Sequence, residues 1–316
     1  MQKITTMEEF TKTVKNAFVA AFPDHEISAA PVTKNNGLCL TGITARSHST
    51  EIAPTIYLEP YFANLQSGSS PLTTIIGEII SNYKAALKEA ANTDAAAIYN
   101  FDSIKHKICY RLVNKKLNHR LLTDMPHRDF MDDLAIIYCL QLEATDDNVK
   151  IIKITDSLAT GIWKVDEETL WRLASENTPR LNRGCVIPMD NMFAEIVGLP
   201  SSTDEDIEQY DGFDITLGSD SALPLYIATC ASKVSGASVI LYKGLLNTLG
   251  EKLGNFYLLP SSIHEILIFP GDPKDAESML EMVKTVNTED VREDEILSDN
   301  CMWYNAATHS LKLITQ

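Results

Sequence analysis

The sequence predicts an α+β fold, in which a small domain with the order α-β-β-β-α is followed by a larger mixed α+β domain with a mainly antiparallel sheet. Two observations support this prediction. Apolar residues recur at helical spacing in some segments and at strand spacing in others. Most predicted strands also come in pairs joined by short turns, which favours antiparallel pairing, whereas a parallel sheet needs long crossovers between its strands.

The small domain, residues 1–95, is predicted from a helix at each end. In 7–22 phenylalanine and valine recur every four positions, and in 72–90 isoleucine and leucine recur every three or four, so both segments form amphipathic helices. Three strands are expected between them, at 27–32, 38–44 and 52–58. A sheet of this size buries one face against two helices, which makes a compact unit.

Lys34, Asn35, Asn36 and Gly37 join the first two strands. Asn-Gly is the strongest short signal for a hairpin because both residues tolerate positive φ. Such a turn can also present backbone amides and an ammonium group to a ligand. Lys34, Asn35 and Asn36 are therefore candidate binding residues, and the alternative is a plain hairpin turn that needs no ligand.

The larger domain, residues 103–316, follows a stretch rich in alanine and asparagine. Its expected strands are 107–113, 134–142, 149–155, 225–230, 256–259, 266–269, 302–304 and 311–314. Its expected helices are 166–177, 188–197, 243–253 and 273–287. Residues 200–222 carry many acids and no basic residue, which predicts a solvated excursion from the domain.

Charge narrows the range of partners. The chain of 316 residues has a net charge of -16, from 43 acids against 27 lysines and arginines, so it repels phosphate backbones and anionic lipid. Neither a bilayer-spanning apolar run nor a secretion signal is evident. Its 6 cysteines are scattered, as is typical of free thiols in a reducing compartment. We expect a cytoplasmic protein that binds neither membranes nor nucleic acid.

Residues 105–120 are a basic exception. Lys105, Lys107 and Arg111 have one parity, so on a strand their charges would lie on one face. That face suits an anion or an acidic partner, with Asn114 and Asn118 adding hydrogen bonds. The alternative is a solvated sheet face balanced by acidic loops.

The segment 259–265, Leu-Pro-Ser-Ser-Ile-His-Glu, is the richest in chemistry and lies between two predicted strands. A serine hydrolase needs a serine within reach of an imidazole that a carboxylate orients, and these residue types are present here. The G-x-S-x-G elbow is missing, however, and on an extended segment His264 and Glu265 point to opposite faces. The alternative is a structural turn in which Ser261 and Ser262 bond the local backbone.

No metal or cofactor site is predicted. His127 lies near several aspartates, but the sequence has no H-x-x-x-H, HExxH or paired-cysteine spacing. It also has no glycine-rich phosphate loop.

Five motifs, taken together, resemble a known family. They are KNNG at 34–37, PTIYLE at 54–59, RLVNxxxN at 111–118, PHRDFxDDLA at 126–135 and LPSSIHE at 259–265. The chain resembles, over essentially its whole length, a family of uncharacterised proteins of similar length from gut-dwelling Gram-positive bacteria. The resemblance implies a soluble intracellular bacterial protein, and no activity, cofactor or catalytic residue follows from it.

The leading hypothesis is a non-enzymatic cytosolic binding or regulatory protein whose partner is a protein or a small molecule. Its candidate binding residues are Lys34, Asn35, Asn36, Asn114, Asn118, His127, Arg128, Ser261, Ser262, His264 and Glu265. One alternative is a hydrolase that uses Ser261 or Ser262 with His127 or His264. Another is an accessory factor of a mobile element that binds a basic surface of a host protein.

Overall fold

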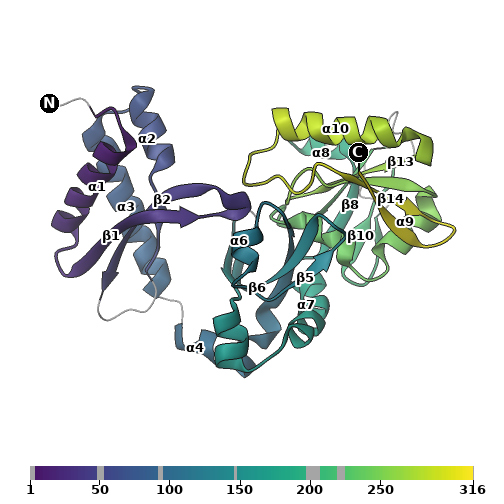
Figure 1. Ribbon diagram of the computed structural model, residues 1–316, viewed down its shortest axis with the longest axis horizontal. Helices are drawn as coiled ribbons and strands as arrows, with labels where there is room; N and C mark the ends of the chain where they lie inside the picture. Colours follow the sequence, from purple (N-terminus) through teal and green to yellow (C-terminus); the bar gives the residue numbers. More distant parts are fainter. Residues whose placement is uncertain are drawn as a thin grey trace. The chain divides into compact units, whose positions relative to one another are not determined.

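The computed structural model describes residues 4–47, 53–91, 95–145, 148–196, 207–218 and 225–315. The proximity of residues divides the chain into two compact units, Met1–Asn100 and Phe101–Gln316, whose elements are labelled in Figure 1. Helices and mainly antiparallel sheets make up the chain, so the predicted α+β fold is confirmed.

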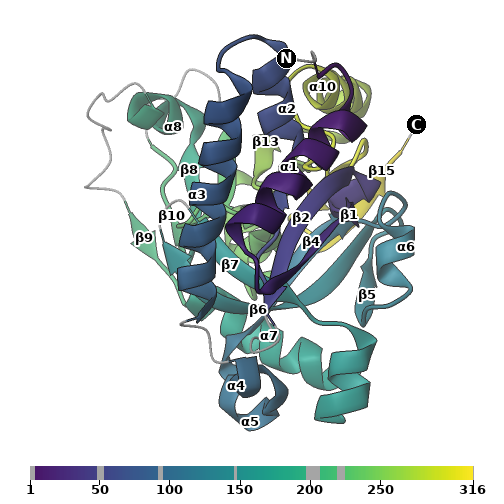
Figure 2. The ribbon, with the colours of Figure 1, turned by 90° about the vertical axis from the view of Figure 1, so that its left-hand side faces the viewer.

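The first unit combines a three-stranded antiparallel sheet, in the order β1-β2-β3, with helices on one face. Its strands are β1 (His25–Thr33), β2 (Cys39–Ser47) and β3 (Ile56–Tyr57). Its helices are α1 (Met7–Ala21), α2 (Glu59–Gln66), α3 (Leu72–Ala91) and α4 (Ala95–Tyr99). Figure 2 shows α1 and α3 lying across the hairpin of β1 and β2.

The apolar faces of α1 and α3 meet the sheet in one core. Phe10, Val14 and Phe18 of α1 are fully buried in it, beside Tyr83 of α3. The Tyr83 hydroxyl accepts the backbone N–H of Ala45 on β2 at 2.6 Å and donates to the carbonyl of the same residue at 3.1 Å. The helix is therefore tied to the sheet by hydrogen bonds as well as by packing.

β1 and β2 form the predicted hairpin. Asn36 and Gly37 have φ of 56° and 75°, the left-handed conformation that this pair of residues favours. The backbone N–H of Lys34 donates to the carbonyl of Leu38 at 2.7 Å and closes the turn.

The first unit departs from the predicted α-β-β-β-α order in three places, one of which is the short helix α4 at its end. α2 is an additional helix, and Pro60 lies at its start, where a missing N–H costs no helical hydrogen bond. The third strand is also shorter than the predicted 52–58, of which residue 52 lies outside the described residues. Pro54 explains the shortening because proline has no N–H to donate to a neighbouring strand.

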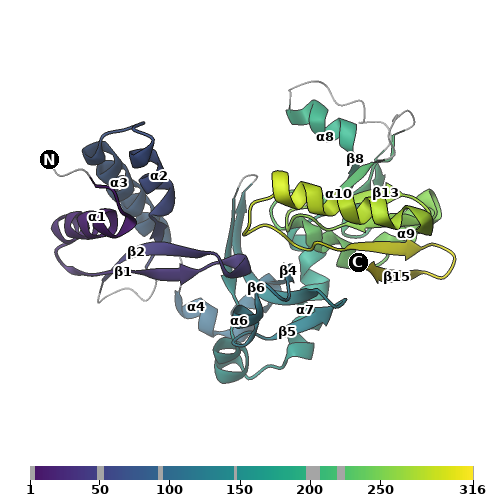
Figure 3. The ribbon, with the colours of Figure 1, turned by 45° about the horizontal axis from the view of Figure 1, so that its top comes forward.

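The second unit contains two sheets (Figure 3). The smaller one consists of β4 (Ile108–Asn114), β5 (His127–Phe130), β6 (Leu134–Thr145) and β7 (Asn148–Lys153). The larger one consists, in spatial order, of β15 (Ser310–Ile314), β14 (Cys301–Asn305), β12 (Phe256–Leu259), β13 (Ile266–Pro270), β11 (Tyr226–Cys230), β8 (Gly184–Pro188), β10 (Phe213–Ile215) and β9 (Glu208–Gln209). The helices are α5 (Phe101–Ile104), α6 (His119–Leu122), the π-helix Ser157–Trp163, α7 (Glu167–Leu181), α8 (Met189–Ile196), α9 (Leu245–Leu253) and α10 (Ala276–Glu289).

α10 covers one face of the larger sheet. Its residues Met279 and Val283 pack into a core with Leu259 of β12. Leu259 pairs with Leu267 of β13, which in turn pairs with Ile227 of β11. Because residues in register point to the same face of a sheet, all three lie on the face that α10 covers.

Within the predicted acidic excursion at 200–222, residues 213–215 form a strand of the larger sheet, whereas 207–209 are exposed. Phe213 and Ile215 of β10 are buried in the larger sheet, next to β8, a strand that the sequence does not indicate. Asp214 lies between them, and its Oδ1 is 2.6 Å from Nη2 of Arg183. Apolar residues alternate here with a neutralised acid, which suits a short strand. Residues 200–206 and 219–222 lie outside the described residues.

β4 is an edge strand whose outward N–H groups are bonded by side chains. The N–H of Tyr110 donates to Oγ1 of Thr178 on α7 at 3.1 Å, and the N–H of Leu112 donates to Oγ of Ser238 at 3.0 Å. Both hydroxyl residues are buried. The edge is thereby satisfied without another strand.

Candidate functional site

The turn between β12 and β13 holds Ser261, Ser262, His264 and Glu265, and a distant segment of the chain clamps it in place. The N–H groups of Leu297 and Ser298 donate to the carbonyls of Ser261 and Pro260 at 3.0 and 2.9 Å. The N–H of Ile263 donates back to the carbonyl of Glu295 at 2.9 Å. This turn is therefore rigidly held, although it belongs to no helix or strand.

Ser262 and His264 are used structurally. Ser261 and Ser262 are 5% and 4% exposed, and Oγ of Ser262 accepts the N–H of His264 at 3.0 Å. Nδ1 of His264 accepts the N–H of Ser235 at 3.2 Å, and its Nε2 lies 3.6 Å from Oε1 of Glu295. The geometry gives no support to the hydrolase alternative, because in the described part of the chain no imidazole is hydrogen-bonded to either hydroxyl.

A cavity of about 380 Å³ opens beside this turn, a volume within the range of small-molecule sites. Residues of α8, α10, β11 and β13 line it, and Figure 3 labels α8, α10 and β13. Most of its walls are apolar, formed by Met189, Met192, Ile227, Leu267, Val286 and Val291. The polar residues of its lining are Ser261, the half-buried Glu265 and the exposed Asp290. Apolar walls with a few converging polar groups are the usual composition of a ligand pocket.

Glu265 is the chemically distinctive residue of this cavity. Burial raises the pKa of its carboxyl, and the nearby charge of Glu295 acts in the same direction. His264 and a hydrogen bond from Ser262 lower the pKa without reversing the shift. The turn therefore presents to the cavity a carboxyl group that ionises less readily than an exposed glutamate.

Residues 295–298, which hold the β12–β13 turn, form a clamp on it, and Asn114 of the smaller sheet bonds this clamp. Its Nδ2 donates to the carbonyl of Leu297 at 2.9 Å, and its Oδ1 accepts the N–H of Leu117 at 2.8 Å. Asn118 is buried and donates to the carbonyl of Asn114 at 2.9 Å. Asn114 and Ser261 thus both bond the backbone of Leu297, and both asparagines have structural roles.

Arg128 is paired with acids at the start of α7. Its Nε and Nη2 donate to the two carboxylate oxygens of Glu167 at 3.1 and 2.9 Å, and Nη2 also donates to Glu168. Its guanidinium carbon lies 4.8 Å from the ring centroid of Trp171. Tyr138 completes the group by donating to Glu167. These contacts use the charge and one face of the guanidinium to hold α7 on the sheet. Nδ1 of neighbouring His127 lies 2.9 Å from the carbonyl oxygen of Met125.

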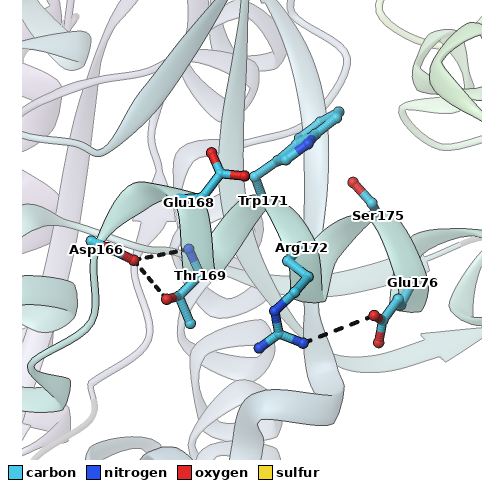
Figure 4. Close-up of a pocket in the computed structure, with 7 residues that line it drawn as sticks. All are labelled: Asp166, Glu168, Thr169, Trp171, Arg172, Ser175 and Glu176. Carbon is cyan, nitrogen blue, oxygen red and sulfur yellow. Dashed lines mark hydrogen bonds and ion pairs between the residues drawn. The ribbon is translucent and has the colours of Figure 1, made fainter.

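A second concave area, of about 410 Å³, lies along the outer face of α7 (Figure 4). It is lined by Asp166, Glu168, Thr169, Trp171, Arg172, Ser175 and Glu176. Asp166 accepts the N–H and the hydroxyl of Thr169, and Arg172 lies 3.9 Å from Glu176. Trp171 is stacked on Tyr110 as well as on Arg128. Most of its charged groups are already paired, Glu168 with Arg128 and Arg172 with Glu176, so this area is a weaker candidate than the cavity beside Glu265.

The candidates of the first unit lie on the β1–β2 turn. Nζ of Lys34 is 4.3 Å from the ring centroid of Tyr57 and donates to its hydroxyl at 3.2 Å. Asn35 and Asn36 form the turn itself. These residues remain candidates for binding.

The predicted basic face is wrong. Lys105 and Lys107 lie in a 3-10 turn, Lys105–Lys107, and β4 begins only at Ile108, so the two lysines do not share a strand face with Arg111. Nζ of Lys105 is 2.8 Å from Asp102, and Nζ of Lys115 is 2.6 Å from Asp129. Local acids therefore balance part of the positive charge of this stretch.

The described ranges contain no group of three or more histidines, cysteines, aspartates or glutamates placed to hold a metal ion. No helix of these ranges has the length and apolar character needed to span a bilayer.

Several cavity residues could not be found from the sequence. Met189, Met192, Val286 and Val291 are ordinary apolar residues in or beside predicted helices, and Asp290 is one acid among many. Only Ser261 and Glu265 were singled out, because they belong to an unusually polar turn.

Fold and site together define an α+β protein with a mainly apolar cavity whose lining includes a half-buried carboxyl, that of Glu265. The chain belongs to a family of unknown function, DUF5688, whose model matches residues 7–306. This confirms the resemblance to an uncharacterised family. Neither the curated proteins nor the solved structures gave a significant match.

Proposed function

We propose that this protein is a non-enzymatic binding protein that holds a small, mainly apolar molecule in the cavity between α8 and α10. The cavity itself carries the proposal. It has the size of a small-molecule site, and its walls are apolar apart from Ser261, Glu265 and Asp290. The alternative chemistry has less support because the hydroxyl of Ser262 and both ring nitrogens of His264 are engaged by neighbouring groups.

We further propose a cytosolic location. All six cysteines are free thiols. Cys109 and Cys139 face each other directly across β4 and β6 and are both buried. Neighbouring unpaired thiols are typical of a reducing compartment, which supports the proposal.

The test is to fill the cavity and measure binding. Val286 is a half-buried residue on α10 that lines the cavity, so Val286→Trp adds bulk there with little disturbance of the core. Met282→Trp introduces the same side chain on the same helix at a position that is 38% exposed and outside the cavity lining. Saturation-transfer NMR against a library of small apolar compounds should detect ligands of the wild-type protein and of Met282→Trp.

Val286→Trp should lose these ligands while keeping its circular dichroism spectrum. Equal binding by Val286→Trp and Met282→Trp would place the ligands elsewhere. A library without a single ligand for the wild-type protein would contradict the proposal.

A further inference from the structure

We infer that the ligand of this cavity is a small primary amine with an apolar body, whose ammonium group pairs with Glu265 and Asp290. The inference rests on the proposed function, since it assumes that the cavity beside α10 is a ligand site. It adds the charge and the chemical class of the ligand.

The side chains that line the cavity have one sign of charge. Glu265 and Asp290 are acidic, and none of the described residues of the lining is cationic. Two basic residues that adjoin lining residues in the sequence, His264 and Arg292, are paired with acids. His264 faces Glu295, and Arg292 lies 3.3 Å from Asp294 and 3.7 Å from Glu295. An anionic ligand would meet carboxylates without a compensating cation, so fatty acids and phosphate esters are disfavoured.

A cationic ligand offsets the cost of placing the carboxylate of Glu265 beside apolar walls. A carboxylate loses hydration when it is buried and is stable there only when it is paired and hydrogen-bonded. Ser262 and His264 lower the pKa of Glu265, yet the pKa remains raised by burial. An ammonium group of a ligand supplies the missing opposite charge and donates charge-assisted hydrogen bonds.

The partial charges at the helix ends beside the cavity do not change its negative charge. The carbonyl of Val286 in the last turn of α10 accepts the N–H groups of Asp290 and Val291, so the negative end of that helix lies at the cavity. The first turn of α8, with Met189, brings a positive end, and the N–H of Met189 is bonded to the carbonyl of Leu225. Each end is worth about half an elementary charge. The two largely cancel, and the carboxylates decide the sign.

The apolar walls of the cavity determine the chemical nature of the uncharged part of the ligand. Ile227 and Leu267 on the sheet and Val286 and Val291 at the end of α10 form apolar surfaces. Met189 and Met192 belong to α8, and methionine side chains adapt to irregular shapes, so they accommodate aliphatic and aromatic bodies alike. The expected ligand is therefore an alkyl or arylalkyl amine with one positive charge.

Titration calorimetry with three matched sets of probes tests this inference. Each set shares one apolar body and differs in its polar group: 2-phenylethylamine, 2-phenylethanol and phenylacetate, together with the hexyl and cyclohexylmethyl equivalents. The variants are Glu265→Gln, which keeps the shape of the side chain, and Glu281→Gln, an exposed residue of α10 outside the cavity lining. The Val286→Trp protein serves as the blocked cavity.

We expect the amine to bind at least about tenfold more tightly than the matched alcohol and carboxylate. Glu265→Gln should weaken the amine by about tenfold and leave the alcohol unchanged, whereas Glu281→Gln should change neither. Amine binding should tighten as the pH rises through the pKa of Glu265, with release of a proton, and Glu265→Gln should remove this dependence.

Three outcomes overturn the inference: alcohols or carboxylates that bind as tightly as amines, amine binding that Glu265→Gln leaves intact, and amine binding that Val286→Trp retains. If alcohols bind as tightly as amines and lose this binding in Val286→Trp, the cavity is a ligand site with another specificity. In that case only the assignment of a positively charged ligand fails. If no probe binds, the proposed function fails with it.

Discussion

Glu265 and Arg128 differ in whether neighbouring groups stabilise the charged form of the side chain. The guanidinium of Arg128 is paired with Glu167 and Glu168 and stacked on Trp171, so its charge contributes to the fold. The carboxyl of Glu265 lines a mainly apolar cavity in which its pKa is raised. A group that costs stability where it is placed is typical of a binding site, whereas a satisfied ion pair is typical of a structural element.

Glu265→Gln is expected to stabilise the protein. Because burial raises the pKa of Glu265, the folded state binds its proton more tightly than the unfolded state does. Wild-type stability therefore falls as the pH rises from the ordinary glutamate value through the raised one, and the variant lacks this loss. Urea denaturation at about pH 8 should show a free energy of unfolding about 1 kcal/mol higher in Glu265→Gln. At about pH 4 the difference should shrink. A destabilised variant at the higher pH would contradict this account.

Arg128→Ala should destabilise the protein in a way that depends on pH. Burial raises the pKa of Glu167, but the hydrogen bonds from Arg128 and Tyr138 outweigh it, and the pKa is lowered overall. The stabilisation is therefore present above the ordinary glutamate pKa and is lost as the pH falls through the lowered value. Near neutral pH the variant should lose about 1–3 kcal/mol in urea denaturation, and its acid-dependent loss should be smaller than that of the wild type.

Arg172→Ala is the matched control for that experiment. Arg172 lies on the same helix, 61% of its side chain is exposed, and it is 3.9 Å from Glu176. An exposed pair of this kind contributes less than about 1 kcal/mol. Equal losses in the two variants would show that Arg128 has no special role in holding α7.

At the scale of elements, the sequence predicts those that carry their own local signals. Helical spacing marks α1 and α3, and Asn36-Gly37 marks the β1–β2 hairpin. The sequence does not indicate β8 and β10, since both are short and β10 alternates apolar residues with an acid whose partner, Arg183, lies in another segment. The cavity was missed for a similar reason, because its walls come from segments that meet only in the folded chain. Glu265 was found because its own turn is polar.

The clamp at Leu297 gives a prediction for the β12–β13 turn. Asn114→Leu removes the donor to the carbonyl of Leu297 and the acceptor of the N–H of Leu117. Unpaired backbone groups at such a site cost about 1–3 kcal/mol. We expect faster hydrogen exchange at the amides of Leu297 and Ser298, which bond the turn. The exposed residue Lys116 provides the control Lys116→Ala. Unchanged exchange in Asn114→Leu would mean that the clamp does not depend on the smaller sheet.

At the scale of the whole molecule, each compact unit has its own core. Phe10, Phe18 and Tyr83 belong to the core of Met1–Asn100, while Leu259 and Val283 belong to a core of Phe101–Gln316. A unit with its own core and its own sheets is able in principle to fold alone. The division of the chain into domains at 1–95 and 103–316 is accordingly a proposal that can be tested.

Residues 1–100 and 101–316 should each fold when produced separately. Heteronuclear NMR of the shorter fragment should give dispersed amide signals, and the longer one should unfold cooperatively in urea. Near-random-coil spectra from either fragment would contradict independent folding. The longer fragment contains every residue that lines the cavity, so it should also retain ligand binding.

The hydroxyls of Thr178 and Ser238 have a consequence for the behaviour of the protein in concentrated solution. They occupy the N–H groups of Tyr110 and Leu112 along the outer edge of β4. An open edge of this kind is a template on which strands of other molecules can assemble. Two small buried side chains thus protect an apolar strand from intermolecular β-pairing. Substitution of Thr178 or Ser238 by a residue without a hydroxyl should therefore first increase aggregation.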